Sequence, residues 1–399
     1  MSTLLIGIDN RCKFYIVPFI QGFYHQGRFL MFKRIFRADT IQVGEGVASG
    51  YLACFLAFLS FLGVIAFHFP EYLTTPELRQ NYDVATLRVV MFYALVVAGS
   101  LGLLNFVRNK NKRLGTVAWV FVVLSIALGG HRVPVGDFPD NTPYIGLDWF
   151  ILDLLGSTLI FILIEKLLPH KKQAIFRPQW QTDFNHFFIN HLLIGFALLV
   201  ANQFVNKTFG WAINADTQNL ISSIWFPLQL ALILLVADLV QYFFHRIYHE
   251  VPLFWRLHAV HHSVKHMDWL AGSRQHILEL LLTRSMVLAP IFLLGFDKSI
   301  IDTYVVIVGF QAVFNHANVR INIGWLKYIF VTPQFHHWHH ASDEAAIDKN
   351  YAAHFSFIDY LLGTAVKAQK EWPDQYGVKG DYMPDGMFKQ QLFPFTHKG

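Results

Sequence analysis

The sequence predicts an all-α, polytopic integral membrane protein, a bundle of six to eight spanning helices with a cytoplasmic, histidine-rich helical cap. Three observations predict this class. Hydrophobic residues make up 54% of the 399 residues and charged residues only 15%, whereas soluble domains usually carry about 25% charged residues. Apolar segments recur along the chain, and most approach the roughly 20 residues that cross a bilayer as a helix. Sixteen of the 20 histidines follow residue 185.

The predicted spans are the apolar runs of the sequence. They cover about residues 46–69, 84–107, 114–130, 145–168, 186–205, 221–244, 277–296 and 300–314. The last run is short, which leaves open whether it spans or packs on protein. We therefore expect four segments: a basic cytoplasmic N-terminus over 1–44, a four-span region over 45–170, a catalytic domain over 171–370 and an irregular tail over 371–399.

Charge in the connecting loops predicts the orientation. Lysine and arginine gather before the first span, after the second in "RNKNKR" and after the fourth, whereas the opposite loops are mostly acidic. Positive charge marks the cytoplasmic side, so we expect the N-terminus and, by span parity, the histidine-rich segments in the cytoplasm. A bacterial inner membrane is expected rather than the endoplasmic reticulum. The net charge of +5 fits a basic rim against anionic lipid and gives no reason to expect a nucleic-acid partner.

Histidines form three short clusters with helical spacing. They are His245 and His249 in "HRIYH", His258, His261 and His262 in "HAVHH", and His336, His339 and His340 in "HHWHH". Positions i, i+3 and i+4 share one face of a helix, so we expect each triplet to converge on one point. His337 lies about 160° around the helix from His339 and is predicted to point elsewhere.

Two single histidines, His276 and His316, stand at the ends of apolar runs, where the clusters are expected to lie. A lone histidine is usually a hydrogen-bonding residue, but three clusters on one face indicate metal binding, which keeps imidazoles neutral and paired. Eight clustered imidazoles exceed the four ligands of a tetrahedral zinc site, so two metal ions fit better. Iron, zinc, copper and nickel all accept imidazole, so ligand type alone does not name the metal.

The order HRxxH, HxxHH and a distant HxxHH followed by "DKNYA" resembles the membrane fatty acid hydroxylase and sterol desaturase superfamily, over about residues 145–370. The pattern is especially similar to bacterial sterol desaturase family members and alkylglycerol monooxygenase-like proteins. The resemblance implies two iron ions, replaceable by zinc in a purified sample, with O₂ as co-substrate. It also implies that His276 and His316 match the family's intermediate histidines, although Ile277 stands where the family often has proline.

Carboxylates and other polar groups usually orient metal-bound imidazoles. The residues expected in this supporting role are Asp238, Tyr242, Glu279, Asp348 and Asn350. A charge inside a span, such as Asp238, is costly and often functional, although a packing role for Asp238 is equally compatible with the sequence. No catalytic residue beyond the metal centre is predicted.

The resemblance implies an O₂-dependent di-iron oxidoreductase that hydroxylates or desaturates a lipid C–H bond at the cytoplasmic face. Its electrons are expected from a separate cytochrome b5-like or ferredoxin-like protein, because no haem-binding, Rossmann or cysteine-cluster motif is present. One alternative is ether-lipid cleavage of the alkylglycerol monooxygenase kind. Another, from a different class, is a membrane metal transporter with a histidine-rich face.

Overall fold

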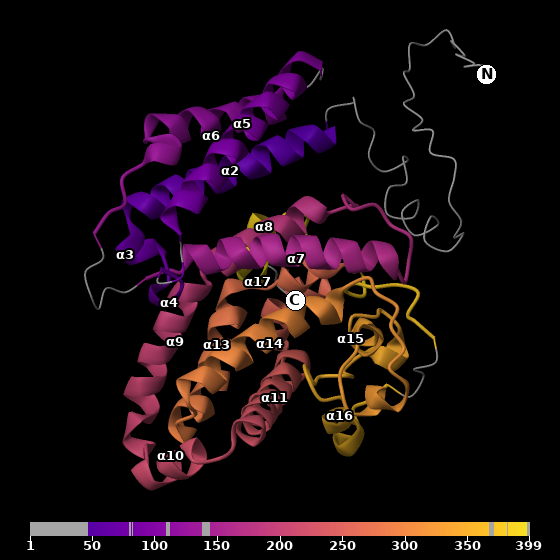
Figure 1. Cartoon of the computed structure of the whole chain (residues 1–399). Coiled ribbons are helices and arrows are strands. Elements are labelled where there is room, and N and C mark those ends of the chain that lie inside the picture. The colour runs from indigo at the N-terminus through magenta and orange to yellow at the C-terminus, as the bar shows by residue number, and fades with distance from the viewer. Residues whose placement is uncertain are drawn as a thin grey trace, which may run out of the picture.

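The computed structural model describes residues 47–396, except residues 80, 82, 109–111, 138–143, 367–370 and 381. The described part is built from helices and holds no strand (Figure 1). Six of its helices are long and apolar enough to cross a membrane. These findings confirm the prediction of an all-α, polytopic membrane protein. The predicted basic segment 1–44 lies outside the described residues.

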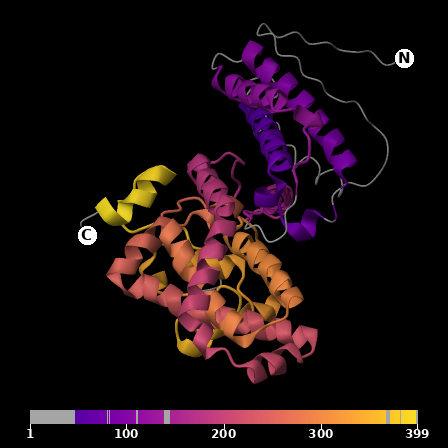
Figure 2. The same cartoon turned by 90° about the vertical axis from the view of Figure 1, so that its left-hand side faces the viewer.

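The first three long helices form a layer of their own. They are α2 (Val47–His68), α5 (Val84–Arg108) and α6 (Arg113–Ala127), with the short α3 (Pro70–Leu73), α4 (Pro76–Arg79) and η1 (Gly130–Arg132) at the turns. Ala53, Ala57, Ala98 and Ala118 are fully buried between them, because small side chains let apolar helices approach closely. Figure 2 shows this layer to one side of the later helices.

Helix α7 (Leu147–Leu167) lies between that layer and the histidine-rich half of the chain (Figure 1). Its buried residues Leu154 and Phe161 share one hydrophobic core with Phe187, Trp269 and Val313. Helix α7 thus packs with elements from both sides of residue 170, where the sequence suggested a boundary.

Four helices carry the chain between the histidines and the opposite end of the bundle. They are α9 (Ile194–Phe209), α11 (Phe226–Glu250), α13 (Ile277–Leu294) and α14 (Lys298–His316), with α10 (Ala215–Ser222) at the turn after α9. The turns of the α9–α11 and α13–α14 hairpins meet at that far end, where Asp297 N donates to Gln229 Oε1 at 3.0 Å. Both hairpins therefore begin and end on the histidine side.

The predicted span over 186–205 is interrupted in the structure. The chain breaks there at Leu193 between α8 (Trp180–Leu192) and α9, and neither piece is among the six apolar helices. Helix α8 instead turns Asp183, His186 and Asn190 into the protein, where Asn190 Nδ2 donates to Ser273 O at 2.9 Å. Helix α14 is also absent from the six. The number of helices long and apolar enough to cross a membrane, among the described residues, is therefore at the lower end of the predicted six to eight.

Short helices and loops close the histidine side of the bundle. They are α12 (Pro252–His262), η3 (Trp269–Ser273), η4 (Gly324–Tyr328), α15 (Pro333–His339), η5 (Glu344–Ala346), α16 (Phe357–Leu362) and α17 (Met387–Thr396). The expectation of a wholly irregular tail is wrong, because α17 is a helix that packs on α8 and α12. His186 and Gln390 are joined by a 2.9 Å hydrogen bond across this contact.

Candidate metal centre

Local sequence explains how each histidine reaches the centre. His245 and His249 occupy the last turns of α11, and α12 begins again at Pro252 directly after the Val251 cap. Proline is favoured at the first helical position because it has no N–H to leave unpaired. Helix α15 begins in the same way at Pro333, after Thr332, whose Oγ1 accepts from Phe335 N. Two short helices thus turn back against the ends of α11 and α14.

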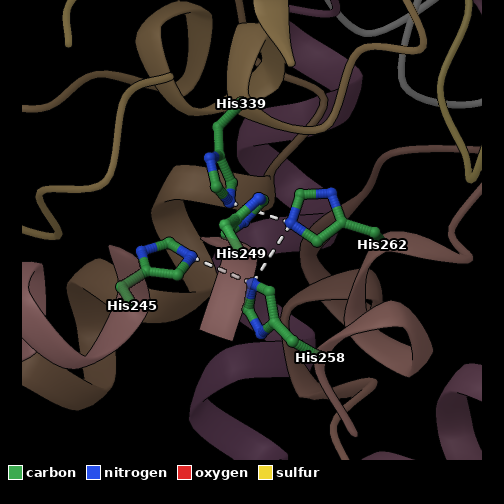
Figure 3. A group of neighbouring side chains, drawn as sticks. All are labelled: His245, His249, His258, His262 and His339. Atoms are coloured by element: carbon green, nitrogen blue, oxygen red, sulfur yellow. Dashed lines mark hydrogen bonds between the residues drawn. The ribbon is translucent and has the colours of Figure 1, made fainter. Parts of the chain in front are cut away.

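Five histidines form what we call the first histidine group: His245, His249, His258, His262 and His339. One ring nitrogen from each lies within 4.8 Å of the others, and Figure 3 shows the rings pointing toward one another. Nε2 of His258 lies 3.0 Å from Nε2 of His245 and 3.2 Å from Nε2 of His262. Nε2 of His262 lies 3.0 Å from Nε2 of His339.

Four others form the second histidine group: His261, His316, His336 and His340. Nε2 of His316 lies 3.3 Å from that of His261, 3.1 Å from that of His340 and 3.0 Å from that of His336. All four are buried. Nine of the ten histidines predicted as ligands thus belong to one of two groups.

The expectation that each HxxHH triplet converges on one point is wrong. His258 and His262, at i and i+4, join the first group, while His261, at i+3, joins the second. In the triplet of α15 the division is reversed: His336 and His340 belong to the second group and His339 to the first. Adjacent helical residues differ by about 100° around the axis, so each triplet reaches two centres. Helix α12 thus gives two histidines to the first group and one to the second, whereas α15 gives one to the first group and two to the second.

Two histidines of the sequence analysis lie outside both groups. His276, predicted as a ligand, caps α13: its Nδ1 accepts from Leu278 N, and its Nε2 donates to Gln391 O at 2.9 Å. With both ring nitrogens engaged in this way, it is not brought to a metal position. His337 points away from the groups, as expected, and contacts Tyr376 Oη through Nδ1 and His316 O through Nε2.

Backbone carbonyls fix the protonation of several rings. His245 Nδ1 donates to Tyr351 O at 2.6 Å, and His339 Nδ1 donates to Lys349 O at 2.7 Å. His261 Nδ1 donates to Arg274 O at 2.9 Å. His316 donates in the same way to Ala312 O at 2.8 Å. A carbonyl oxygen only accepts, so the proton resides on Nδ1 and the lone pair on Nε2. The lone pairs therefore face the centre of each group.

These converging lone pairs fit a metal ion in each group. In the first group, His245 and His258 both carry the proton on Nδ1, yet their Nε2 atoms are only 3.0 Å apart. His261 and His316 repeat this at 3.3 Å in the second. Two nitrogens that each lie about 2.1 Å from one metal at a right angle are about 3.0 Å apart. A cation would turn these repulsive contacts into bonds.

Burial favours the neutral ligand form. It lowers the pKa of His262 and of His340 well below the ordinary value, and positive charge on neighbouring imidazoles would lower it further. Nε2 of His249 is buried without a hydrogen-bond partner. An unpaired buried nitrogen is costly and is accounted for by ligation.

Two of the five predicted supporting residues contact the grouped histidines. Glu279 Oε1 accepts from His258 Nδ1 at 2.8 Å, and both residues are buried. Asp348 Oδ1 lies 3.2 Å from His249 Nδ1 and is about half exposed, with its backbone in the left-handed region at φ 56°. Carboxylates in these positions orient the ring and raise its basicity.

The other three supporting residues hold the loop that follows α15 rather than a ring. Asp238 accepts from the backbone N–H groups of Ala353, His354 and Phe355 at 2.6–3.0 Å. Asn350 links Phe335 O to Val366 N through its amide. This loop supplies the carbonyls of residues 349 and 351 that orient His339 and His245.

Tyr242 acts on the same loop from α11. Its hydroxyl is 2.9 Å from Thr364 Oγ1, which in turn donates to Asp359 Oδ1. Asp359 accepts from Tyr351 N and Ala352 N at 2.8 Å, so Tyr242 acts on His245 through the loop.

A buried ion network supports the second group and was missed in the sequence. Arg177 pairs with Asp183 and Asp268, and Arg274 pairs with the other oxygen of Asp183. Arg274 is fully buried, and its own carbonyl orients His261. Arg177 and Asp268, like Asp183 and Arg274, are 91 residues apart, so no short sequence motif predicts that they pair. The only indication of a buried arginine is the position of Arg274, in "SRQH", next to an apolar run.

Comparison with known proteins follows the same region. Residues 230–364 match the fatty acid hydroxylase family. An ornithine lipid hydroxylase of Rhizobium tropici is 29% identical over 261 residues, which cover 63% of this chain and 77% of the relative. Human alkylglycerol monooxygenase is 33% identical over 131 residues, 32% of this chain and 28% of the relative.

A very-long-chain aldehyde decarbonylase of Oryza sativa is 26% identical over 146 residues, 34% of this chain and 23% of the relative. The matches thus span about a quarter of the length of the alkylglycerol monooxygenase and of the aldehyde decarbonylase. No solved structure matches the chain significantly. These relatives are enzymes, which confirms the enzyme prediction over a metal transporter. The region that matches the fatty acid hydroxylase family, residues 230–364, contains all nine grouped histidines.

Proposed function

We propose that the protein is an O₂-dependent di-iron enzyme of the bacterial inner membrane that hydroxylates a C–H bond of a membrane lipid at the cytoplasmic face. The observation that carries the proposal is the pair of histidine groups, with five and four imidazoles. Iron bound in both groups would supply the oxidising power that an unactivated C–H bond requires and that acid–base side chains lack.

The chain's own residues would prepare this centre. Carbonyls 349 and 351 and Glu279 hold protons on Nδ1 of His339, His245 and His258, which leaves their Nε2 atoms free to ligate. An all-imidazole set is neutral, so the bound metals would keep more positive charge than with the carboxylates of soluble di-iron bundles. The burial of both groups would exclude water from the reacting position.

The position of the groups fits a lipid substrate. The first group stands at the end of the apolar α11 and the second at the end of α14, so a lipid head group would lie at the interface while its chain follows the helices. Exposed Lys171, Lys172 and Arg320 lie on the same side and would attract an anionic leaflet. The electrons would come from a separate cytochrome b5-like or ferredoxin-like protein.

Ether-lipid cleavage is a second candidate, favoured by the 33% identity to alkylglycerol monooxygenase. That match covers 28% of the relative. Both candidates begin with oxidation at a lipid C–H bond, so the products distinguish them better than the site does.

The test combines metal analysis of the purified protein with lipid mass spectrometry of cells that carry the wild type or the His262→Ala variant. We expect about two irons per chain and a lipid that gains one oxygen atom only with the wild type. Loss of two hydrogen atoms would indicate desaturation, and loss of an ether-linked chain would indicate cleavage. An unchanged lipid profile in cells that contain the iron-loaded protein and its electron donor would refute the proposal.

A further inference from the structure

An apolar groove runs along the outer side of α14. It has a volume of about 490 Å³, and α14 contributes Val306, Phe310 and Phe314 to its lining. These residues are spaced four apart, so they align on one helix face over about 12 Å of the axis. Ile323 and Phe330 line the groove from the segment between α14 and α15, and Pro333 lines it as the first residue of α15.

One end of the groove lies at the end of α14 and the start of α15, the two helices that supply His316 and His336, and no histidine lines it. Phe314 precedes His316 by two residues on α14, and Pro333 precedes His336 by three residues on α15. The two helices pack together, and both histidines belong to the second group. The other end, at Val306, is eight residues or about 12 Å from Phe314 along α14, toward the hairpin turn and away from the histidines.

The lining indicates a hydrocarbon occupant. No charged side chain lines the groove, and its polar members are Gln311 and Thr332. Gln311 Oε1 accepts from His354 Nδ1 at 2.8 Å and Thr332 Oγ1 accepts from Phe335 N, so these oxygens are already used within the protein. The groove therefore offers burial rather than head-group recognition.

The groove is continuous with the apolar outer surface of α14. Val305, Val306 and Phe310 are 48%, 56% and 48% exposed, as expected of side chains that face lipid. A chain could therefore enter sideways from the bilayer, with its head group at the histidine end and its methyl end toward Val306. This continuity selects an acyl chain of a membrane lipid over a water-borne ligand.

We propose that the groove binds the part of the substrate's acyl chain that lies beyond the reacting carbon, and that Val306 limits its length. The inference rests on the proposed function, because it identifies the occupant as the substrate of the same centre. A larger side chain at residue 306 would fill the far end and exclude the terminal carbons of a long chain, while a shorter chain would still fit.

The test uses neighbouring residues of the same type. Val306→Trp fills the groove, whereas Val305→Trp changes a similarly exposed valine that does not line it. Each full-length protein is placed in phospholipid vesicles containing a phospholipid with a photoactivatable diazirine near its methyl end, and cross-linked peptides are mapped. We expect the wild type and Val305→Trp to cross-link at the far end of the groove. Val306→Trp should cross-link there about tenfold less, the equivalent of about two methylene groups left unburied.

Cross-linking needs no turnover, so it separates this inference from the proposed function. Cross-links in the groove without any oxidised lipid would contradict the proposed enzymatic function but would support acyl-chain binding in the groove. Oxidised lipid with equal chain-length preference in both valine variants would refute the groove alone. Cross-links spread evenly over the apolar helices, or protein–protein cross-links from a second copy seated there, would also refute it. The wild-type map decides the matter even where Val306→Trp does not fold.

Discussion

Replacing Glu279 with alanine should weaken the first histidine group selectively. Glu279 Oε1 accepts from His258 Nδ1 at 2.8 Å, and both side chains are buried. Without the carboxylate, His258 Nδ1 has no acceptor in this position, so the proton can move to Nε2 and occupy the lone pair that faces the group. The second group takes its orientation from other residues, such as Arg274 and Ala312.

The magnitude follows from the lost hydrogen bond. A buried polar donor left without its acceptor costs about 1–3 kcal/mol, and about 1.4 kcal/mol corresponds to a tenfold change in affinity. Glu279→Ala should therefore weaken one metal site about 10- to 100-fold, the range typical of such supporting carboxylates. Glu279→Gln retains an acceptor oxygen without the charge and should have a smaller effect.

The assay is a competitive titration of the iron-loaded protein with a coloured chelator. The wild type should release both metals at similar chelator concentrations, whereas Glu279→Ala should release one about 10- to 100-fold earlier. Glu250→Ala is the matched control, because Glu250 is an exposed glutamate at the end of α11 that pairs with Arg246. Equal release curves for the two alanine variants would refute the orienting role of Glu279.

Three further predictions concern the support of the two groups. Asp238→Ala should lower the free energy of unfolding by about 3 kcal/mol or more, because three backbone N–H groups lose their acceptor; a thermal unfolding midpoint equal to that of the wild type would contradict this. His339→Ala should abolish activity, whereas the neighbouring His337→Ala should largely retain it. Equal losses of turnover in the two variants would contradict the placement of His339 in the first group and of His337 outside both groups. Arg274→Lys should reduce iron occupancy of the second group, since its ion pair fixes the carbonyl that orients His261; full occupancy by metal analysis would rule out that role.

The three histidine boxes were predictable because each stays within one turn of helix. Their spacing identified eight of the nine residues that the structure brings into two groups, and the number of imidazoles already favoured two metals. The ninth, His316, was singled out by its place at the end of an apolar run and by the family resemblance. How the triplets divide was not predictable from one helix. His261 and His262 point to different groups only because α12 and α15 face each other across the ends of α11 and α14, which is a property of the tertiary fold.

The supporting residues were predicted less well, because their partners are backbone atoms. A carboxylate inside an apolar helix marked Asp238 as unusual, but its partners are the N–H groups of residues 353–355, which no side-chain pattern reveals. Glu279 lies near His258 only after α12 and α13 pack together. His276 shows the converse, since a histidine at a helix start serves equally well as an N-cap.

The membrane region could be predicted from composition except where polar residues are buried in protein. The run over 186–205 is apolar enough to suggest a span, yet Asp183 and Asn190 of α8 bond to Arg274 and Ser273 of the histidine domain. Those contacts hold α8 against the cap, and α8 ends at Leu192 before α9 begins. Average hydropathy does not contain this information.

The most direct test of two metal sites is an anomalous difference map at the iron edge from crystals of the iron-loaded protein. Two peaks are predicted, one within each histidine group, each about 2.1 Å from the nearest imidazole nitrogens. His276 and His337 should lie outside both coordination spheres. A single peak, or a peak coordinated by His276 in place of a grouped histidine, would contradict the account.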